Sequence, residues 1–248
     1  MRSLRAELLK TLTTRLLVWY GLALVAFLAL VVSSHIGSED RLRLATASTQ
    51  RSVFNAAGLA AVTAVLLGSL VITSEYNHGT LNQSLLAVPV RERLLAAKLG
   101  AAALVAVALA VLGDVATLGI AELWYAGRGV TLHLDGATLT PLLGAVGASA
   151  LAAAIGLGLG AFVRRQTASI VAILLWLLIG ESVVALMEGA APYAPGHAVA
   201  AVAVARRHGG GETLGVWPAV AASLAYAVIL LVAGAVVMRN SDVPSGGD

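Results

Sequence analysis

Residues 99–121 read LGAAALVAVALAVLGDVATLGIA, a run of 23 residues in which Asp114 is the only charged side chain. A transmembrane α-helix needs about 20 predominantly apolar residues, so this run predicts a membrane span. Five further stretches of the chain are comparably long and apolar. The six predicted spans are residues 16–34, 53–73, 99–121, 139–163, 166–187 and 216–238.

The composition of the 248-residue chain leaves little for a water-soluble domain. Hydrophobic residues make up 59% of it and charged residues 12%, whereas soluble domains contain about 25% charged residues. Backbone polar groups in a bilayer must find partners within the protein, so spans of this kind form helices. We therefore predict an all-α polytopic membrane protein whose residues 1–248 form a single transmembrane domain.

Several classes of site are excluded or unsupported. Cysteine is absent, which excludes disulfides, thiol catalysis and cysteine-based metal sites. The five histidines are dispersed and none has a partner at metal-ligand spacing, so no metal site is predicted. No G-x-S-x-G or H-E-x-x-H motif supports a membrane hydrolase. The first span also lacks the short apolar core and the cleavage site of a signal peptide.

The basic residues favour an orientation with both termini in the cytoplasm, because Lys and Arg concentrate on that side of a membrane. In that orientation ten of the 16 basic residues lie inside and six lie outside. We therefore attribute the net charge of +3 to the basic residues that orient the protein in the membrane, and we expect no nucleic-acid binding. Lysine occurs only at positions 10 and 98, among abundant Ala, Gly, Val and Arg. This bias suggests a GC-rich bacterial genome and hence the bacterial plasma membrane.

The polar segment after the second span, residues 74–98, reads SEYNHGTLNQSLLAVPVRERLLAAK. Thr80 and Gln83 fit a capping box, and Gly79 before them allows a tight reversal of the chain. The pattern predicts a short helix over residues 81–88. Its apolar side consists of Leu81, Leu85 and Leu86, and Pro89 ends it.

Two interpretations of this short helix are equally compatible with the residues alone. A capped helix with one apolar edge can sit in a cleft of a partner protein. It can also lie on the inner leaflet as an ordinary amphipathic loop.

Three other segments lie outside the spans. In residues 1–15 leucines recur every four positions among charged residues, which predicts an amphipathic interfacial helix; the alternative is a cytoplasmic extension of the first span. Residues 188–215 contain a short apolar run, 197–205, that predicts an interfacial or re-entrant helix. Residues 239–248 are expected to be a flexible tail.

The fourth span carries small residues at every fourth position, on one face of the predicted helix. Small residues let helix backbones approach closely in lipid. This face is expected to pack closely, either within the subunit or across a dimer interface, although Ala and Gly are so common here that the spacing can also be accidental. The five residues are Gly144, Ala148, Ala152, Gly156 and Gly160.

Two acidic residues lie inside predicted spans, Asp114 in the third and Glu181 in the fifth. A carboxylate at the centre of a bilayer costs about 2.5–3.5 kcal/mol or more. One interpretation places both in the translocation path, lining an outward-facing cavity. The other is a structural hydrogen bond to a neighbouring helix, or a position near the outer interface.

The order of parts resembles the permease subunits of ABC transporters of the ABC-2 exporter type. The resemblance rests on the six spans and on residues between the second and third of them, and it extends over essentially the whole chain. One departure is that the last outer segment has Ala-Pro pairs at 191–192 and 194–195, where the family often has Leu-Pro. The matching residues are Glu75, Gly79, Thr80, Leu86, Pro89, Arg93 and Lys98.

This resemblance implies that residues 74–98 couple the chain to a separate ATPase. It also implies half of a transport pathway, which pairs with a second copy or a related permease and with two copies of a nucleotide-binding subunit. ATP and Mg²⁺ would bind that partner, and the chain itself would be no enzyme and hold no cofactor. Consistently, the sequence contains no G-x-x-x-x-G-K-[ST] phosphate loop.

Two other functions remain open at this point. A proton-coupled secondary transporter could use Asp114 and Glu181 as a relay, although we find no inverted repeats of the kind such transporters contain. A membrane protein that transports nothing is the third possibility. The substrate is not indicated by any residue pattern.

Overall fold

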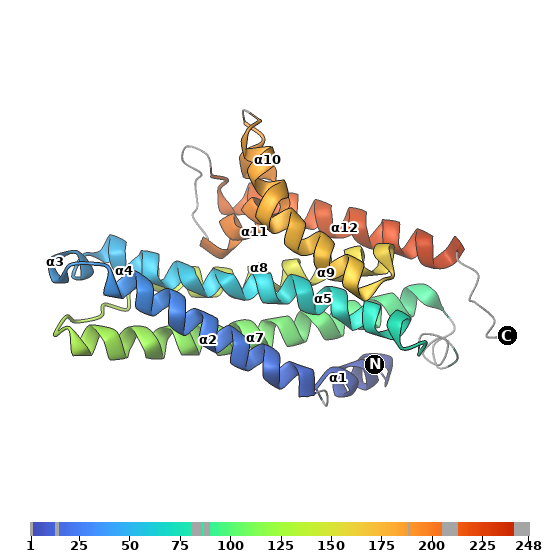
Figure 1. The fold of residues 1–248 in the computed structure, drawn as a ribbon, viewed down its shortest axis with the longest axis horizontal. Helices are drawn as coiled ribbons and strands as arrows, with labels where there is room; N and C mark the ends of the chain where they lie inside the picture. The colour runs from blue at the N-terminus through green and yellow to red at the C-terminus, as the bar shows by residue number, and fades with distance from the viewer. Residues whose placement is uncertain are drawn as a thin grey trace.

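The computed structural model describes residues 2–12, 15–80, 86, 90–187, 189–204 and 213–240. Within this part the chain is helical and has no strand, and its long helices run lengthwise through an elongated molecule (Figure 1). In chain order the elements are α1 (Arg2–Leu12), α2 (Arg15–Gly37), α3 (Arg41–Leu44), α4 (Ala47–Phe54), the 3₁₀ turn η1 (Asn55–Leu59), α5 (Ala60–Asn77), α7 (Arg91–Gly127), α8 (Gly136–Val163), α9 (Gln166–Leu175), the π turn η2 (Trp176–Gly180), α10 (Glu181–Ala185), the 3₁₀ turn η3 (Ala191–Tyr193), α11 (Pro195–Val204) and α12 (Val216–Asn240).

Six helical stretches are long and apolar enough to cross a membrane, which confirms the predicted all-α fold class. Most of the short helix predicted over residues 81–88 lies outside the described residues. The six stretches are Leu17–Gly37, Ala47–Asn77, Arg91–Gly127, Thr138–Val163, Gln166–Ala185 and Val216–Asn240.

The third of these, α7, is much longer than the predicted span 99–121. Its 37 residues extend about 55 Å at a rise of 1.5 Å per residue, whereas the hydrocarbon core of a bilayer is about 30 Å thick. The helix therefore includes residues 91–98 and 122–127, which join the spans in sequence. Residues 91–98 are charged enough to leave the membrane and consist of good helix formers (Arg, Glu, Leu, Ala and Lys), so the helix continues through them.

The second and fifth spans are not regular α-helices throughout. A 3₁₀ turn, η1, separates α4 from α5, and the π turn η2 separates α9 from α10. Near η1 the backbones approach closely: a Cβ added to Gly58 would lie 2.9 Å from the Cβ of Ala203 in α11. Such interruptions within a span need surrounding protein or a cavity to satisfy the backbone.

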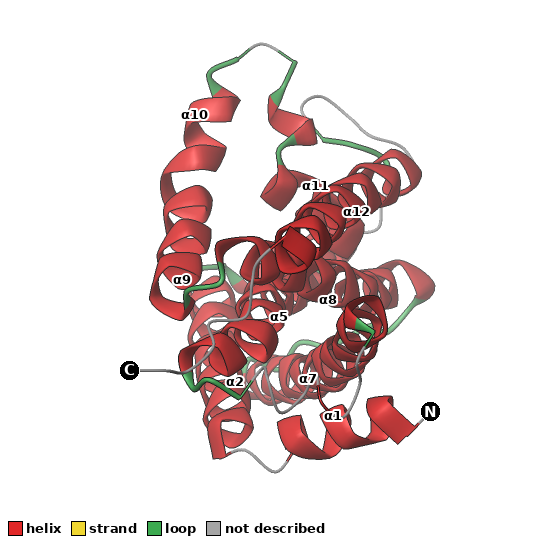
Figure 2. Cartoon of the chain, turned by 90° about the vertical axis from the view of Figure 1, so that its right-hand side faces the viewer, coloured by secondary structure: helices red, strands yellow, loops and turns green. Residues whose placement is uncertain are grey.

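The centre of the bundle is the contact between α5 and α8, around which the other spans are arranged (Figure 2). It is built from small residues that leave almost no space between the two backbones. A Cβ on Gly68 of α5 would lie 2.1 Å from the carbonyl oxygen of Ala153 in α8. Close backbone packing is the main source of helix association in lipid, where hydrophobicity does not draw helices together.

At one end of the molecule, Gln50 of α4 holds the connection between α7 and α8. Its side chain is 1% exposed. The amide nitrogen donates to the carbonyl oxygens of Leu44 (3.3 Å) and Thr131 (3.0 Å), and the amide oxygen accepts from the backbone N–H of His133 (2.9 Å). The connection after the first span forms α3 and α4, and Gln50 packs it against the connection between α7 and α8.

Candidate coupling site

The C-terminus of α5 is built by Gly79, which adopts the left-handed conformation with φ of 66°. The Gly79 N–H donates to the carbonyl of Tyr76 (3.4 Å), and the Thr80 N–H donates to that of Glu75 (3.1 Å). This pair of bonds is a Schellman motif, in which glycine is favoured because it lacks a Cβ. The reversal predicted at Gly79 is thus the end of the second span.

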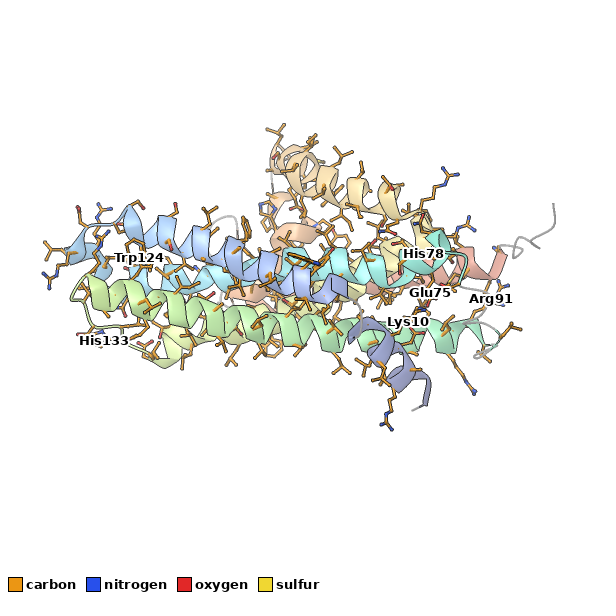
Figure 3. All side chains as sticks on the ribbon, turned by 60° about the horizontal axis from the view of Figure 1, so that its bottom comes forward. Lys10, Glu75, His78, Arg91, Trp124 and His133 are labelled. Atoms are coloured by element: carbon orange, nitrogen blue, oxygen red, sulfur yellow. The ribbon has the colours of Figure 1, made fainter. Side chains whose placement is uncertain are left out.

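Just inside this turn, Glu75 forms part of a cluster of four charged residues, which we call the charge cluster: Glu7, Lys10, Glu75 and Lys98. The ammonium of Lys98 in α7 lies 2.9 Å from the Oε2 of Glu7 in α1 and 2.8 Å from the Oε1 of Glu75 in α5. The Lys10 ammonium also bonds to Glu75 Oε1. Figure 3 shows Lys10 and Glu75 pointing toward one another from α1 and α5.

The charge cluster is deeply buried at its centre. The side chains of Lys98 and Glu75 are 1% and 2% exposed, that of Glu7 is 11% exposed, and that of Lys10 is 50% exposed. Two carboxylates and two ammonium groups make the cluster neutral as a whole. Since buried ions are tolerated only when they are paired and hydrogen-bonded, each member depends on the others.

The charge cluster fixes α1 against the start of α7. Leu4 of α1 packs on Gly100, where an added Cβ would lie 2.9 Å from its Cδ1. α1 runs in a different direction from α2 (Figures 1 and 3). The structure thus differs from a simple extension of the first span, and α1, α5 and α7 meet at one end of the molecule.

The start of α7 is also attached to the end of α12. The Arg91 guanidinium donates to the carbonyl oxygens of Met238 and Arg239. Arg93, two residues later, is exposed. Figure 3 shows Arg91 and His78 at the same end as Glu75, and Trp124 and His133 at the opposite end.

Leu86 was also predicted to contact the ATPase. Its side chain is 86% exposed. Leu81, Leu85 and Pro89 lie outside the described residues.

Glu181, one of the two acidic residues predicted within spans, is the first residue of α10 and is 7% exposed. Its Oε1 accepts from the Gly196 N–H (2.8 Å) and from Trp176 Nε1 (2.6 Å), and its Oε2 accepts from the His197 N–H (3.1 Å). His197 Nδ1 also contacts Oε2. Glu181 therefore caps the N-terminus of α11, a position where a carboxylate is favoured by the free N–H groups and the helix dipole.

Asp114 lies elsewhere, in α7, and is partly buried. Its Oδ1 is buried and accepts no hydrogen bond within the described part of the chain. α7 and α10 lie on opposite sides of the molecule in both views (Figures 1 and 2). The structure does not bring Asp114 and Glu181 together, so their place in a shared translocation path stays a prediction.

The sequence matches the family described as ABC-2 family transporter protein over residues 3–180. The match covers well over half of the chain, from α1 to the π turn. The chain belongs to the ABC-2 transporter family. The resemblance inferred from the sequence is thereby confirmed, and the six membrane-spanning helices are those of a multi-pass ABC-2 type permease. A search among curated proteins found no relative of this ABC-2 permease.

Sequence reasoning missed three residues of the ABC-2 permease that the structure places at this site: Glu7, Lys10 and Arg91. Lys10 and Lys98 are the only lysines of the chain, and both bind Glu75. The chain has two lysines and 14 arginines, and the rarity of lysine could have indicated that Lys10 and Lys98 share one site. A flexible ammonium with three donors suits a site shared between two carboxylates.

The small-residue face of α8 packs within this ABC-2 permease subunit. A Cβ on Gly144 would lie 2.2 Å from the carbonyl oxygen of Ala203 in α11. Added Cβ atoms on Gly156 and Gly160 would lie 1.9 Å from the carbonyl oxygen of Val65 and 2.8 Å from that of Ser69, both in α5. Ala148 and Ala152, on the same face, are 0% and 3% exposed.

Replacing Glu181 with alanine should loosen α11. The variant removes the acceptor of two backbone N–H groups at the helix start, and hydrogen bonds to a charged group each contribute about 1.5–3 kcal/mol. We expect faster hydrogen–deuterium exchange in residues 195–204 and little change in α8. Glu122→Ala, in an exposed position on α7, is the control. Unchanged exchange in α11 would argue against the capping role and favour one in the translocation path.

Proposed function

We propose that this ABC-2 permease is the membrane-spanning subunit of an ATP-driven exporter. In this proposal it forms the translocation path and couples to a separate ATPase through residues 74–98. ATP and Mg²⁺ bind the ATPase, of which two copies assemble with two permeases, either identical or related. Both termini face the cytoplasm of a bacterial plasma membrane.

The observation that carries the proposal is the ion pair that joins the two ends of residues 74–98 within the charge cluster. Residues 78–90 connect α5 to α7, and Glu75 and Lys98 lie just inside those two attachment points. A force applied to the segment therefore reaches α5 and α7 beside a pair of buried ions.

The contacts of the charge cluster also determine which helices would move together. Because Glu7 and Lys10 belong to the cluster, α1 is drawn into the same unit. Arg91 adds the end of α12 through its bonds to backbone carbonyls. A switch between two packed arrangements needs rigid units of this kind, since packed interfaces are bistable and do not deform continuously.

The proposed orientation of the permease in the membrane agrees with the distribution of its basic residues. Lys10, Arg91, Lys98 and Arg239 belong to the end of the molecule that the coupling segment joins. Basic residues concentrate on the cytoplasmic side, which is where an ATPase would have access to ATP.

Purification of the permease from its native membrane, with analysis for an ATPase subunit, tests the coupling. We expect the two to copurify in mild detergent, and Gly79→Ala to reduce the ATP-driven transport of the reconstituted complex several-fold. Alanine at a left-handed position costs about 1–2 kcal/mol, so the turn would shift. Among the described residues an added Cβ at Gly79 meets nothing within 4 Å, so the expected loss comes from backbone strain and not from a clash with another of these residues.

Gly119→Ala is the matched control, because its Cβ also meets no described residue within 4 Å and its backbone has no positive φ. It should transport as the wild type does. The proposal fails if no ATPase copurifies and if Gly79→Ala and Glu75→Gln both leave transport unchanged.

A further inference from the structure

A cavity of about 600 Å³ lies between α5, α8, α9, α11 and α12. This volume is within the range of about 300–1,000 Å³ found for small-molecule sites. None of the described residues that line it is charged. Its walls are almost entirely aliphatic side chains, and Asp114 and Glu181 are not among them.

The irregular turns within the second and fifth spans, η1 and η2, both line this cavity. η1 contributes Asn55, Gly58 and Leu59 to the wall, and the π turn η2 contributes Trp176 and Leu177. π turns inside helices occur frequently at functional sites, and transporters often form their binding sites from discontinuous spans. Two independent irregularities at one cavity are difficult to explain by packing alone.

The cavity reaches the exposed outer surface of the membrane-spanning helices. Trp176 and Ile229 belong to its wall and are 41% and 63% exposed. Ile229 lies in the middle of α12, next to Val228, which is 56% exposed. An apolar molecule in the bilayer would therefore find the entrance within the hydrocarbon.

The polar side chains on the wall are mostly engaged. The Tyr226 hydroxyl donates to the carbonyl of Tyr193 (2.8 Å), and the Trp176 indole donates to Glu181. The Oδ1 of Asn55 accepts no hydrogen bond within the described residues. A buried amide oxygen left without a donor is costly. Rotation of the Asn55 amide about χ2 would turn this oxygen toward the cavity that Asn55 lines, where one hydroxyl or amide N–H of a ligand could donate to it.

We propose that this cavity binds an uncharged, mostly aliphatic molecule with a single hydrogen-bond donor, which enters from the bilayer and donates to Asn55. The absence of basic residues on the described wall disfavours a phospholipid headgroup as the bound group. The site requires neither ATP nor an ATPase, so it stands or fails separately from the proposed export.

Photolabelling of the permease alone, in phosphatidylcholine nanodiscs, tests the inference. The probes are a long-chain alcohol with a diazirine in its chain and the matching alkane without the hydroxyl. We expect saturable labelling of the wall peptides from η2 and α12, with half-saturation by the alcohol at a concentration roughly five-fold lower than by the alkane. Asn55→Leu should abolish that preference while leaving the protein folded, because it removes an unsatisfied polar group.

Ala200→Phe, on the wall of the cavity, should reduce the labelling about ten-fold or more, because the larger ring occupies the space. Val228→Phe adds the same ring to the lipid-facing surface beside the entrance and should change nothing. Unsaturable labelling spread over all spans, or equal labelling of Ala200→Phe, would overturn the site. Equal binding of alcohol and alkane would overturn the role of Asn55.

Discussion

Lys98→Met is expected to lower the free energy of unfolding by about 3–5 kcal/mol, because it removes one partner of a buried ion pair. Lys98 is fully buried, and its ammonium joins Glu7 to Glu75. Methionine keeps most of the side-chain volume but not the charge, so the effect isolates electrostatics from packing. Thermal unfolding in detergent measures the loss, and faster exchange in α1 should accompany it.

The control for this variant is Arg93→Met. Arg93 lies five residues earlier on the same helix, is exposed and forms no ion pair within the described part of the chain. Surface changes of this type usually stay within about 0.5 kcal/mol. Equal losses from the two substitutions would mean that the charge cluster contributes nothing specific.

A double variant separates the pairing from other effects of methionine. In Glu7→Gln with Lys98→Met, one carboxylate and the cation are removed together, and Glu75 retains Lys10. The double variant should therefore be more stable than Lys98→Met alone, since residues in one ionic network do not contribute additively. If the two losses simply add, Glu7 and Lys98 are not coupled.

The spans were predictable because hydropathy is a local property of the chain. Residues 99–121 needed no partner to be recognised as a span, and α7 contains them all. Glu75 and Lys98 could also be selected, since both stand out in the polar segment between two spans. Their pairing with α1 could not, because Glu7 and Lys98 are separated by 91 positions and meet only through tertiary packing.

Glu181 shows a different limit. Its position inside an apolar run indicated an unusual environment, but the sequence could not distinguish a structural bond from a translocation path. The N–H groups that bond its carboxylate, those of Gly196 and His197, are backbone atoms of another helix. Any residue provides such atoms, so no side-chain pattern indicates them. The irregular turns η1 and η2 could not be predicted either, because they depend on tertiary contacts. Gly58 of η1 packs against α11, and both turns line the cavity.

The small-residue face of α8 was recognisable from its spacing, but spacing alone allowed contact within one subunit or between two. The structure packs it against α5 and α11 of the same subunit, and Gly156→Ala tests that assignment. Its new Cβ would lie 1.9 Å from the carbonyl oxygen of Val65. A backbone atom cannot rotate away, so α5 and α8 must separate along the contact at the centre of the bundle. We expect a loss of about 3 kcal/mol, at the upper end of overpacking effects, measured by thermal unfolding.

Gly147→Ala is the control on the same helix, where the nearest atom to an added Cβ is Val202 Cγ1 at 3.9 Å. That is an ordinary contact, and alanine favours a helix over glycine by about 1 kcal/mol, so this variant should be neutral or slightly more stable. A dimer contact through Gly156 would give the opposite pattern: Gly156→Ala would unfold like the wild type but run as a smaller complex in size-exclusion chromatography. Stability therefore reports on the contact within the subunit, and oligomeric state reports on a contact between subunits. Measuring both for the two glycine variants tests which contact involves this face.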